Sequence, residues 1–521
     1  MLYSRRRTIT VNIGNIPMGS DYPVRIQSMG NTQTRDIDSS VEQCIRIIKA
    51  DADYVRFTVP SLSDVKAFAA IKSRIREKNY SAPLIADVHF NPEIALKVAE
   101  YADKVRVNPG NFIDKSRFTE LIRICREQGV AIRIGVNHGS LSEKIMDRYG
   151  DTPAGMVESA MEFLRICRDE NFDQVVVSMK ASNVRVMVYA TRLIAHIMDR
   201  EGLNYPLHLG VTEAGAGEDG RIKSAAGTGT LLAGGLGDTI RVSLTEEPEA
   251  EIPVAARIAN LFSGKEVYSR GRFEFVKRKT RPTGNIGGNQ VPVVPGFDKL
   301  DIGIRLIEGD WDNMNDQFIQ ELSSDTKAVL VYKAESENIP AELSALREKL
   351  EGCEVPVIIK LNLKETSAED FMLKSAAFLG GAFIDGFGDG IWLTNSFPLE
   401  KDFINSVSLG ILQACRTRMS KTEYISCPSC GRTQFNLMQT VARIKQATSH
   451  LKGLKIGVMG CIVNGPGEMA DADYGYVGAG KGKITLYKAR EVVKKGVPEG
   501  QAVDELIALI KENGDWIDMD S

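Results

Sequence analysis

The chain has 521 residues, of which 43% are hydrophobic and 26% charged, and its net charge is -3. This length exceeds one ordinary core, so we expect two or three globular domains. The slightly acidic balance gives no basis for binding nucleic acid or an anionic membrane. No apolar run approaches the roughly 20 residues of a membrane span, and the arginine-rich N-terminus lacks the apolar segment of a signal peptide. We therefore expect a cytoplasmic α/β protein.

Eight apolar, β-rich runs occupy residues 24–244, each followed by a loop and an amphipathic helix pattern. The runs are Val24–Met29, Tyr54–Val59, Leu84–Val88, Lys104–Asn108, Ala131–Asn137, Gln174–Lys180, Leu207–Glu213 and Thr239–Leu244. Between them, Asn91-Pro92 is typical of a helix N-cap followed by proline at the first helical position. Eight strand-then-helix units predict a (β/α)8 TIM barrel, which we assign to residues 1–262.

Charged and other polar side chains stand at or just beyond the C-terminal ends of these runs. They are Asn31, Thr32, Arg56, Asp87, His89, Arg106, Asn108, Arg133, Asn137, Lys180, Glu213, Arg241 and Ser243. In a barrel these ends converge on one mouth. Four arginines and a lysine gathered there indicate a multiply charged anion such as a diphosphate, because guanidinium forks pair with phosphate oxygens. Pairing with rim carboxylates explains any single arginine equally well, but explains the whole set less readily.

Residues 263–404 are interpreted as an inserted α/β domain. Its first part, Ser263–Gln290, is rich in glycine and basic side chains and predicts a linker or flexible loop. Predicted strands then alternate with helical patterns. The strands are Ala328–Lys333, Val355–Leu361, Ala382–Phe387 and Gly390–Thr394.

One segment of this insert repeats a segment of the barrel. Gly388–Thr394 follows the pattern of Gly237–Ser243, with Trp392 where the barrel has Arg241. We infer a partial duplication of the barrel that has lost the phosphate-binding arginine and serves as a spacer domain.

Residues 405–521 predict a small α/β domain that contains the arranged cysteines. Cys427 and Cys430 form a C-x-x-C pair, Cys461 follows a short apolar strand, and the turn Asn464–Gly467 brings Glu468 back towards it. Three thiolates without a fourth cysteine suit either an iron–sulfur cluster with one unusual iron or a zinc site with one other ligand. The spacing favours the cluster, because zinc ribbons usually close with a second C-x-x-C or a histidine pair.

These residues leave two kinds of enzyme open. One is a reductase that joins a diphosphate site to a redox metal centre. The other is a Schiff-base aldolase acting on a sugar phosphate, with Lys180 as nucleophile and zinc stabilising the C-terminal domain. A zinc-stapled binding scaffold is the alternative that involves no catalysis.

Several motifs together resemble the 4-hydroxy-3-methylbut-2-enyl diphosphate synthase family. They are Val24–Met29 (VRIQSM), Lys104–Asn111 (KVRVNPGN), Arg133–Asn137 (RIGVN), Leu209–Gly215 (LGVTEAG), Cys427–Arg432 (CPSCGR) and Asn464–Glu468 (NGPGE). The insert at 263–404 departs from the common two-domain form and resembles the three-domain form. With such a spacer, a chain could fold its cluster domain over its own barrel.

The resemblance implies a two-electron reductive opening and dehydration of 2-C-methyl-D-erythritol 2,4-cyclodiphosphate, in the methylerythritol phosphate route to isoprenoids. It implies a [4Fe-4S] cluster held by Cys427, Cys430, Cys461 and Glu468, with Glu468 as a ligand that substrate displaces. Arg56, Arg106, Arg133, Lys180, Arg241 and Ser243 would hold the diphosphate, with Asn108 and Asn137 assisting. Asp87 and Glu213 would face the carbon skeleton, with Glu213 as proton donor. The expected electron donor is reduced ferredoxin or flavodoxin, and the expected state is a monomer or homodimer.

Overall fold

A computed structural model describes residues 5–89, 91–112, 114–267, 269, 271–463 and 465–518. The chain divides into two compact units. The first, here called the barrel unit, comprises Arg6–Gly220, Gly237–Ala256 and Lys421–Ser521. The second, here called the insert unit, consists mainly of Arg221–Leu236 and Arg257–Ser420. In the part of the chain described, no helix is long and apolar enough to cross a membrane.

The predicted (β/α)8 barrel is confirmed. Its parallel strands are β3 (Arg25–Met29), β4 (Tyr54–Thr58), β5 (Leu84–Asp87), β6 (Lys104–Val107), β7 (Ala131–Asn137), β8 (Val175–Lys180), β9 (His208–Leu209) and β10 (Thr239–Ile240). They pair in the order β8-β7-β6-β5-β4-β3-β10-β9, and a bridge between Val177 and Leu207 joins the two ends. The last two strands are shorter than predicted.

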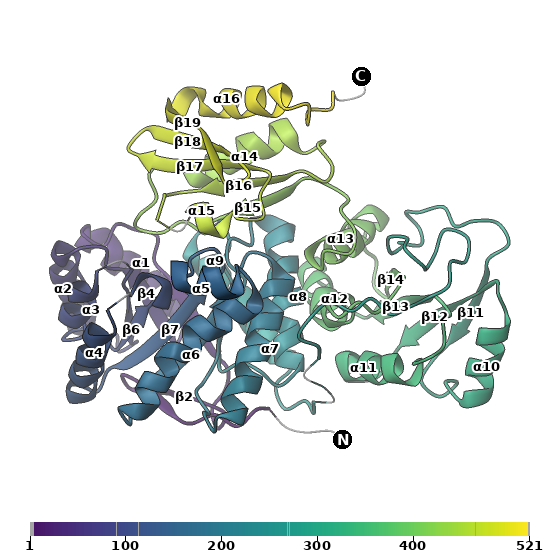
Figure 1. Cartoon of the computed structure of the whole chain (residues 1–521), viewed down its shortest axis with the longest axis horizontal. Helices are drawn as coiled ribbons and strands as arrows, with labels where there is room; N and C mark the ends of the chain where they lie inside the picture. The colour runs from purple at the N-terminus through teal and green to yellow at the C-terminus, as the bar shows by residue number, and fades with distance from the viewer. Residues whose placement is uncertain are drawn as a thin grey trace. The chain divides into compact units, whose positions relative to one another are not determined.

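Helices follow the barrel strands in the chain and lie outside the sheet (Figure 1). They are α1 (Ile37–Lys49), α2 (Leu62–Glu77), α3 (Pro92–Val98), α4 (Lys115–Gln128), α5 (Glu143–Tyr149), α6 (Pro153–Asp169), α7 (Val184–Arg200), α8 (Gly217–Ala233) and α9 (Pro248–Asn260). The predicted start of α3 is confirmed, because Asn91 caps it by accepting from Glu93 N at 3.0 Å and Pro92 is its first residue.

A short N-terminal hairpin that the sequence analysis did not predict packs against the barrel core. It consists of antiparallel β1 (Val11–Ile13) and β2 (Ile16–Met18). Its apolar side chains are fully buried against residues near the N-terminal ends of barrel strands. The cluster contains Val11, Ile13, Met18, Tyr54, Ile85, Ala131 and Val176. The hairpin therefore covers the barrel end opposite the mouth, where conserved chemistry is not expected.

The insert unit contains a four-stranded parallel sheet in sequential order. Its strands are β11 (Arg305–Gly309), β12 (Ala328–Ala334), β13 (Val357–Leu363) and β14 (Gly390–Asn395), and its helices are α10 (Asp316–Ser324), α11 (Ile339–Lys349), α12 (Ala368–Ile384) and α13 (Lys401–Ala414). The strand β11 was not predicted.

The predicted strand Ala382–Phe387 is wrong, because α12 continues to Ile384. The Gly380-Gly381 pair looks like a break before a strand, yet it lies inside the helix. A Cβ at Gly380 would lie 2.9 Å from the Ala226 Cβ of α8. The glycines therefore allow α12 and α8 to approach closely, and tertiary packing outweighs their low helix propensity.

Hydrogen bonds support the predicted duplication. In the barrel, Asp238 accepts from Thr8 Oγ1 at 2.9 Å and from Leu207 N at 2.8 Å. In the insert, Asp389 accepts from Thr280 Oγ1 and from Val357 N, each at 3.0 Å. The same aspartate thus ties the start of the preceding strand to an N-terminal threonine in both copies.

The prediction of a flexible loop at 263–290 is wrong for its second half. Thr283 and Ile286 form an antiparallel bridge, and Ile286 is fully buried in the insert core. This bridge flanks Gly284-Asn285, as β1 and β2 flank Gly14-Asn15, and both glycines have positive φ. The duplication therefore includes the N-terminal hairpin, and glycine serves the tight turn rather than flexibility.

The C-terminal part, here called the cysteine domain, has a five-stranded sheet. Its strands are β15 (Glu423–Ser426), β16 (Lys455–Met459), β17 (Tyr474–Gly480), β18 (Lys483–Lys488) and β19 (Glu491–Pro498), the first three parallel and the rest antiparallel. Helices α14 (Leu437–Thr448) and α16 (Glu499–Glu512) pack on one face, whereas the short α15 (Gly465–Glu468) lies by the other. The turns that carry the cysteines follow β15 and β16.

Candidate active site

A cavity lies at the barrel mouth, where the barrel and the cysteine domain meet. All of the predicted site residues except Asn108 line it. They are Arg56, Asp87, Arg106, Arg133, Asn137, Lys180, Glu213, Arg241, Ser243, Cys427, Cys430, Cys461 and Glu468. The strand-end argument and the cysteine motifs thus lead to the same site.

Asn108 instead organises the loop after β6. Its Oδ1 accepts from Gly110 N at 3.1 Å, and its Nδ2 donates to Ser140 Oγ at 3.0 Å. A position at the end of a strand does not decide whether the side chain faces the mouth or the following turn.

Five buried cations, Arg56, Arg106, Arg133, Lys180 and Arg241, are here called the clamp. Burial lowers the pKa of Arg56 to about 10, and burial and the neighbouring arginines hold the pKa values of Arg133 and Lys180 well below their ordinary range. So many close cations destabilise one another without a counterion. The clamp is therefore suited to a multiply charged anion.

The clamp arginines differ in their partners. Arg241 forms a buried two-pronged ion pair with Glu251, at 3.0 and 3.1 Å. Arg56 directs Nε and Nη2 at the Met29 sulfur, a weak acceptor. Arg133 has no hydrogen-bond partner for Nε or Nη1 among the described residues. Pairing with a carboxylate at the barrel rim thus explains Arg241, whereas Arg133 has donors that can bind a ligand.

A second polar layer lies deeper in the barrel. Lys104, Gln27 and Ser178 each precede a cavity residue by two positions on the same strand and so share its face. Each has a buried polar atom without a partner among the described residues. Burial holds the pKa of Lys104 well below its ordinary value, and its Nζ lies 5.0 Å from the Tyr54 ring centroid. Such groups are normally satisfied by buried water.

Two glutamates meet where β9 ends. Thr212 Oγ1 donates to Glu468 Oε2 at 2.7 Å, and Asn137 Nδ2 donates to Glu468 Oε1. Burial, together with the charge and the hydrogen bond of Glu213, raises the pKa of Glu468 well above its ordinary value. Glu213 has a positive φ of 48°, which is uncommon for a side chain of this kind. The two carboxyl groups therefore lie in contact inside the cavity.

The three cysteines line the side of the cavity formed by the cysteine domain. Gly460 N donates to Cys427 Sγ at 3.2 Å, and burial raises the pKa of this thiol. Within the described residues, no three His, Cys, Asp or Glu side chains converge closely enough to hold a single metal ion.

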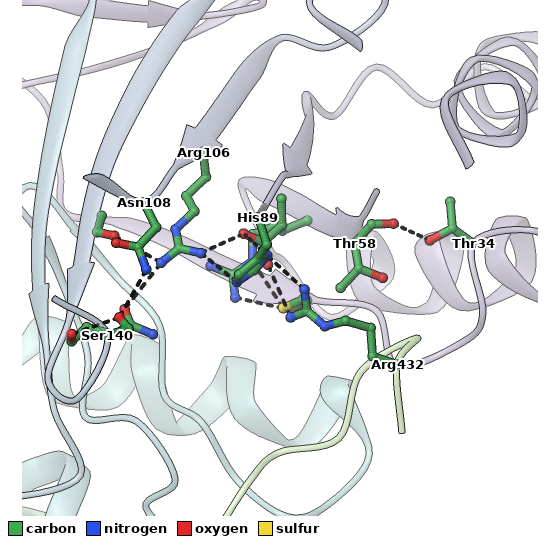
Figure 2. Close-up of polar contacts among 12 residues, drawn as sticks. Thr34, Thr58, His89, Arg106, Asn108, Ser140 and Arg432 are labelled. Carbon is green, nitrogen blue, oxygen red and sulfur yellow. Dashed lines mark hydrogen bonds and ion pairs between the residues drawn. The ribbon is translucent and has the colours of Figure 1, made fainter. Parts of the chain in front are cut away.

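The strand-end argument reaches His89 without giving it a role, and the sequence analysis did not assign Arg432 to the site although it quoted the motif that contains it. His89 is buried, and its Nε2 lies 2.8 Å from Arg106 Nη1. Its Nδ1 lies 2.7 Å from Nη1 of Arg432, which comes from the cysteine domain. Figure 2 shows the two arginines on either side of the ring. The C-x-x-C-G-R spacing, which places an arginine two residues after a cysteine, was the available signal.

Asp87 lies beside this group and compensates part of its charge. Arg106 Nη1 is 3.3 Å from Asp87 Oδ1, and Arg432 Nη2 is 3.8 Å from Asp87 Oδ2. Burial alone would raise the pKa of Asp87, but His89 and the surrounding arginines hold it well below its ordinary value. One carboxylate therefore serves two guanidinium groups.

The cysteine domain is docked on the barrel of the same chain. Thr245 Oγ1 lies 2.8 Å from Ser426 Oγ, and Asn183 Nδ2 donates to Asp471 Oδ2 at 2.9 Å. A Cβ on Gly467 would lie 2.5 Å from the Gly139 carbonyl oxygen, so the two backbones touch. These contacts lie within one compact unit of the chain.

Comparison with known proteins covers the whole chain. The GcpE TIM-barrel domain matches residues 8–256, and the GcpE protein C-terminal domain matches residues 423–512. A 4-hydroxy-3-methylbut-2-en-1-yl diphosphate synthase (flavodoxin) of Bacteroides fragilis is 47% identical, over 99% of this chain and 97% of that protein. The chloroplastic ferredoxin form of Oryza sativa is 38% identical, over 99% of this chain and 88% of that protein. The chain therefore belongs to the GcpE family of 4-hydroxy-3-methylbut-2-en-1-yl diphosphate synthases.

Proposed function

We propose that this chain reduces 2-C-methyl-D-erythritol 2,4-cyclodiphosphate to 4-hydroxy-3-methylbut-2-enyl diphosphate, in the methylerythritol phosphate route. The observation that carries the proposal is the single cavity in which a cationic clamp faces three thiols. A diphosphate needs the clamp, and a reduction needs a redox centre within reach. Family membership and the names of the relatives support the same reaction.

The clamp holds the diphosphate. Arg133 and Lys180 approach from neighbouring strands β7 and β8, and Arg56 approaches from β4. Ser243, beyond β10, also lines the cavity and adds a hydroxyl donor. Buried strands fix the positions of these groups before substrate binds. They can therefore orient the substrate ring without rearranging during the reaction.

The residues present fit a [4Fe-4S] cluster. Cys427, Cys430 and Cys461 would hold three irons, and Glu468 would hold the fourth when no substrate is bound. The backbone N–H of Gly460 at Cys427 Sγ is the kind of donor that supports a metal-bound thiolate. When bound, the cluster supplies electrons one at a time.

The reaction consumes two electrons and one proton. A C–O bond of the ring breaks and releases the diphosphate arm, and a hydroxyl group departs as water after it receives the proton. Glu213 is the proposed donor of that proton. It contacts Glu468, and its position in the cavity places it beside the substrate carbon skeleton. Asp87 is proposed to face the same skeleton.

Glu468 has two roles in this proposal. Both of its carboxylate oxygens accept from barrel side chains, Asn137 and Thr212, in the structure. A carboxylate with partners of its own in the barrel can leave the metal centre at low cost when substrate arrives. Reduced flavodoxin or ferredoxin is the proposed electron source, in line with the names of the relatives.

Oxygen-free purification tests the proposal. We expect about four irons and four acid-labile sulfides per chain, a broad visible absorbance, and formation of the allylic diphosphate when a low-potential reductant is supplied. A colourless protein with one zinc per chain would overturn it. The low pKa of Lys180 also suits a Schiff-base aldolase, so borohydride trapping is the second arm. A substrate adduct on Lys180 would support that rival.

A further inference from the structure

We propose that Arg432 is the cysteine domain's own contribution to the diphosphate clamp, and that His89 holds it in place until substrate arrives. This inference rests on the proposed function, because it needs an anionic substrate in the cavity. It makes Arg432 a positioning residue that couples substrate binding to closure of the cysteine domain over the barrel.

The first observation is where Arg432 lies. It follows Cys430 by two positions in the chain, yet its side chain is only 12% exposed and enters the barrel mouth. Its guanidinium group reaches both His89 and Asp87. A single side chain thus links the cysteine loop to residues after barrel strand β5.

The second observation is a shortage of acceptors. A neutral imidazole has one N–H and one bare nitrogen, and a protonated imidazole has no acceptor at all. Both ring nitrogens of His89 face arginine nitrogens, at 2.7 and 2.8 Å. At most one of these contacts is a good hydrogen bond, and Asp87 is the carboxylate close to both arginines. Arg106 Nη2 already donates to Gly135 O at 3.0 Å and to Asn137 Oδ1 at 3.3 Å, so the shortage concerns the arginine nitrogen that faces the N–H of His89. Phosphate oxygens placed between Arg432 and Arg106 would supply an acceptor there.

The third observation is that the backbone fixes the position of Arg432. A Cβ on Gly431 would lie 2.7 Å from the Thr32 carbonyl oxygen and 2.9 Å from Thr58 Oγ1. The cysteine loop is therefore seated directly on the barrel, and any side chain at Gly431 would lift it. Arg432 reaches His89 only when the loop is fully seated, which is the property that a closure residue needs.

Substrate affinity is the first test. We expect Arg432→Gln to weaken binding of the cyclic diphosphate by about 10- to 100-fold in calorimetry on the anaerobic holoenzyme, and Arg432→Lys to recover part of the loss. Gly431→Val should reproduce the defect while keeping the arginine. Arg490→Gln is the matched control, because Arg490 also joins the two domains, at 3.2 Å from Asp151, but is 58% exposed and outside the cavity. Its affinity should stay within about twofold of wild type.

Closure is the second readout. Substrate should slow hydrogen exchange in the touching loops around Gly139 and Gly467 of the wild type, and this protection should be lost in Arg432→Gln. Iron and sulfide are measured for every variant. Should Arg432→Gln lose its cluster, His89→Phe leaves the cysteine loop intact and must show the same loss of affinity. Wild-type affinity in either cluster-replete variant would overturn the inference. Failure of the wild type to turn over substrate would instead refute the proposed function.

Discussion

Arg133 and Arg241 belong to the same clamp but should respond oppositely to replacement by methionine. Arg133 has two guanidinium nitrogens without partners among the described residues, whereas Arg241 is paired with the buried carboxylate of Glu251. In the absence of substrate, Arg133 is an uncompensated buried cation. We therefore expect Arg133→Met to stabilise the ligand-free enzyme and Arg241→Met to destabilise it.

The expected change in the free energy of unfolding depends on which charged groups each replacement leaves buried. Replacing a whole buried ion pair by apolar side chains of similar size is neutral or stabilises proteins by about 1 to 4 kcal/mol. By the same desolvation argument, we expect about 1 to 2 kcal/mol for Arg133→Met. Breaking a buried pair costs about 3 to 5 kcal/mol. We expect the lower end for Arg241→Met, because Leu244 N and Ser28 Oγ still donate to Glu251, each at 3.2 Å.

The substrate should reverse this order for Arg133. Two charge-assisted hydrogen bonds to phosphate are lost in Arg133→Met, which at about 1.5 kcal/mol each weakens affinity by roughly 150-fold. Anaerobic unfolding without substrate measures the first effect, and calorimetric titration with the cyclic diphosphate measures the second. If Arg133→Met lowered the free energy of unfolding as much as Arg241→Met, Arg133 would have a structural partner and this reasoning would fail.

Three further predictions address other parts of the site. Glu213→Gln should lower turnover by about 10²- to 10⁴-fold while substrate affinity is retained, and unchanged turnover would exclude Glu213 as the proton donor. A mixture of Arg133→Met and Cys461→Ser enzymes should show no more activity than the two separately, because each chain covers its own barrel; restored activity would indicate exchange between chains. Lys104→Met should raise the melting temperature, since it removes a buried ammonium group that lacks a hydrogen-bond partner among the described residues, and a lower melting temperature would show that water or an anion compensates it fully.

The barrel and most of the site were predictable because one rule connects them. Parallel strands in a barrel present their C-terminal ends at one mouth, so polar residues there converge however far apart they lie in sequence. This rule alone was enough to place Arg56 and Arg241 at the mouth. Asn108 also stands at a strand end, but the prediction that it lines the site fails. A side chain at a strand end can equally turn back to cap the following loop.

Other features depended on contacts that no local pattern contains. Gly380-Gly381 interrupts an apolar run as a loop would, and only the close approach of Ala226 explains why the helix continues. Ile286 lies in glycine-rich sequence typical of a linker, and only its burial in the insert core reveals a folded hairpin. Arg432 follows a metal-binding motif, and the sequence does not indicate that it points into another domain.

Comparing the barrel with the similar segment of the insert distinguishes residues that the fold needs from residues that the chemistry needs. Asp238 and Asp389 keep the same two hydrogen bonds, so the scaffold contact was retained in both. The clamp contact was not, because Trp392 replaces Arg241 and its ring stacks with Lys360 at 4.7 Å. The insert segment thus keeps the aspartate contact of the scaffold and lacks the arginine of the clamp. The hydrogen bonds of Asp238 therefore belong to the fold, whereas the ion pair of Arg241 with Glu251 belongs to the site.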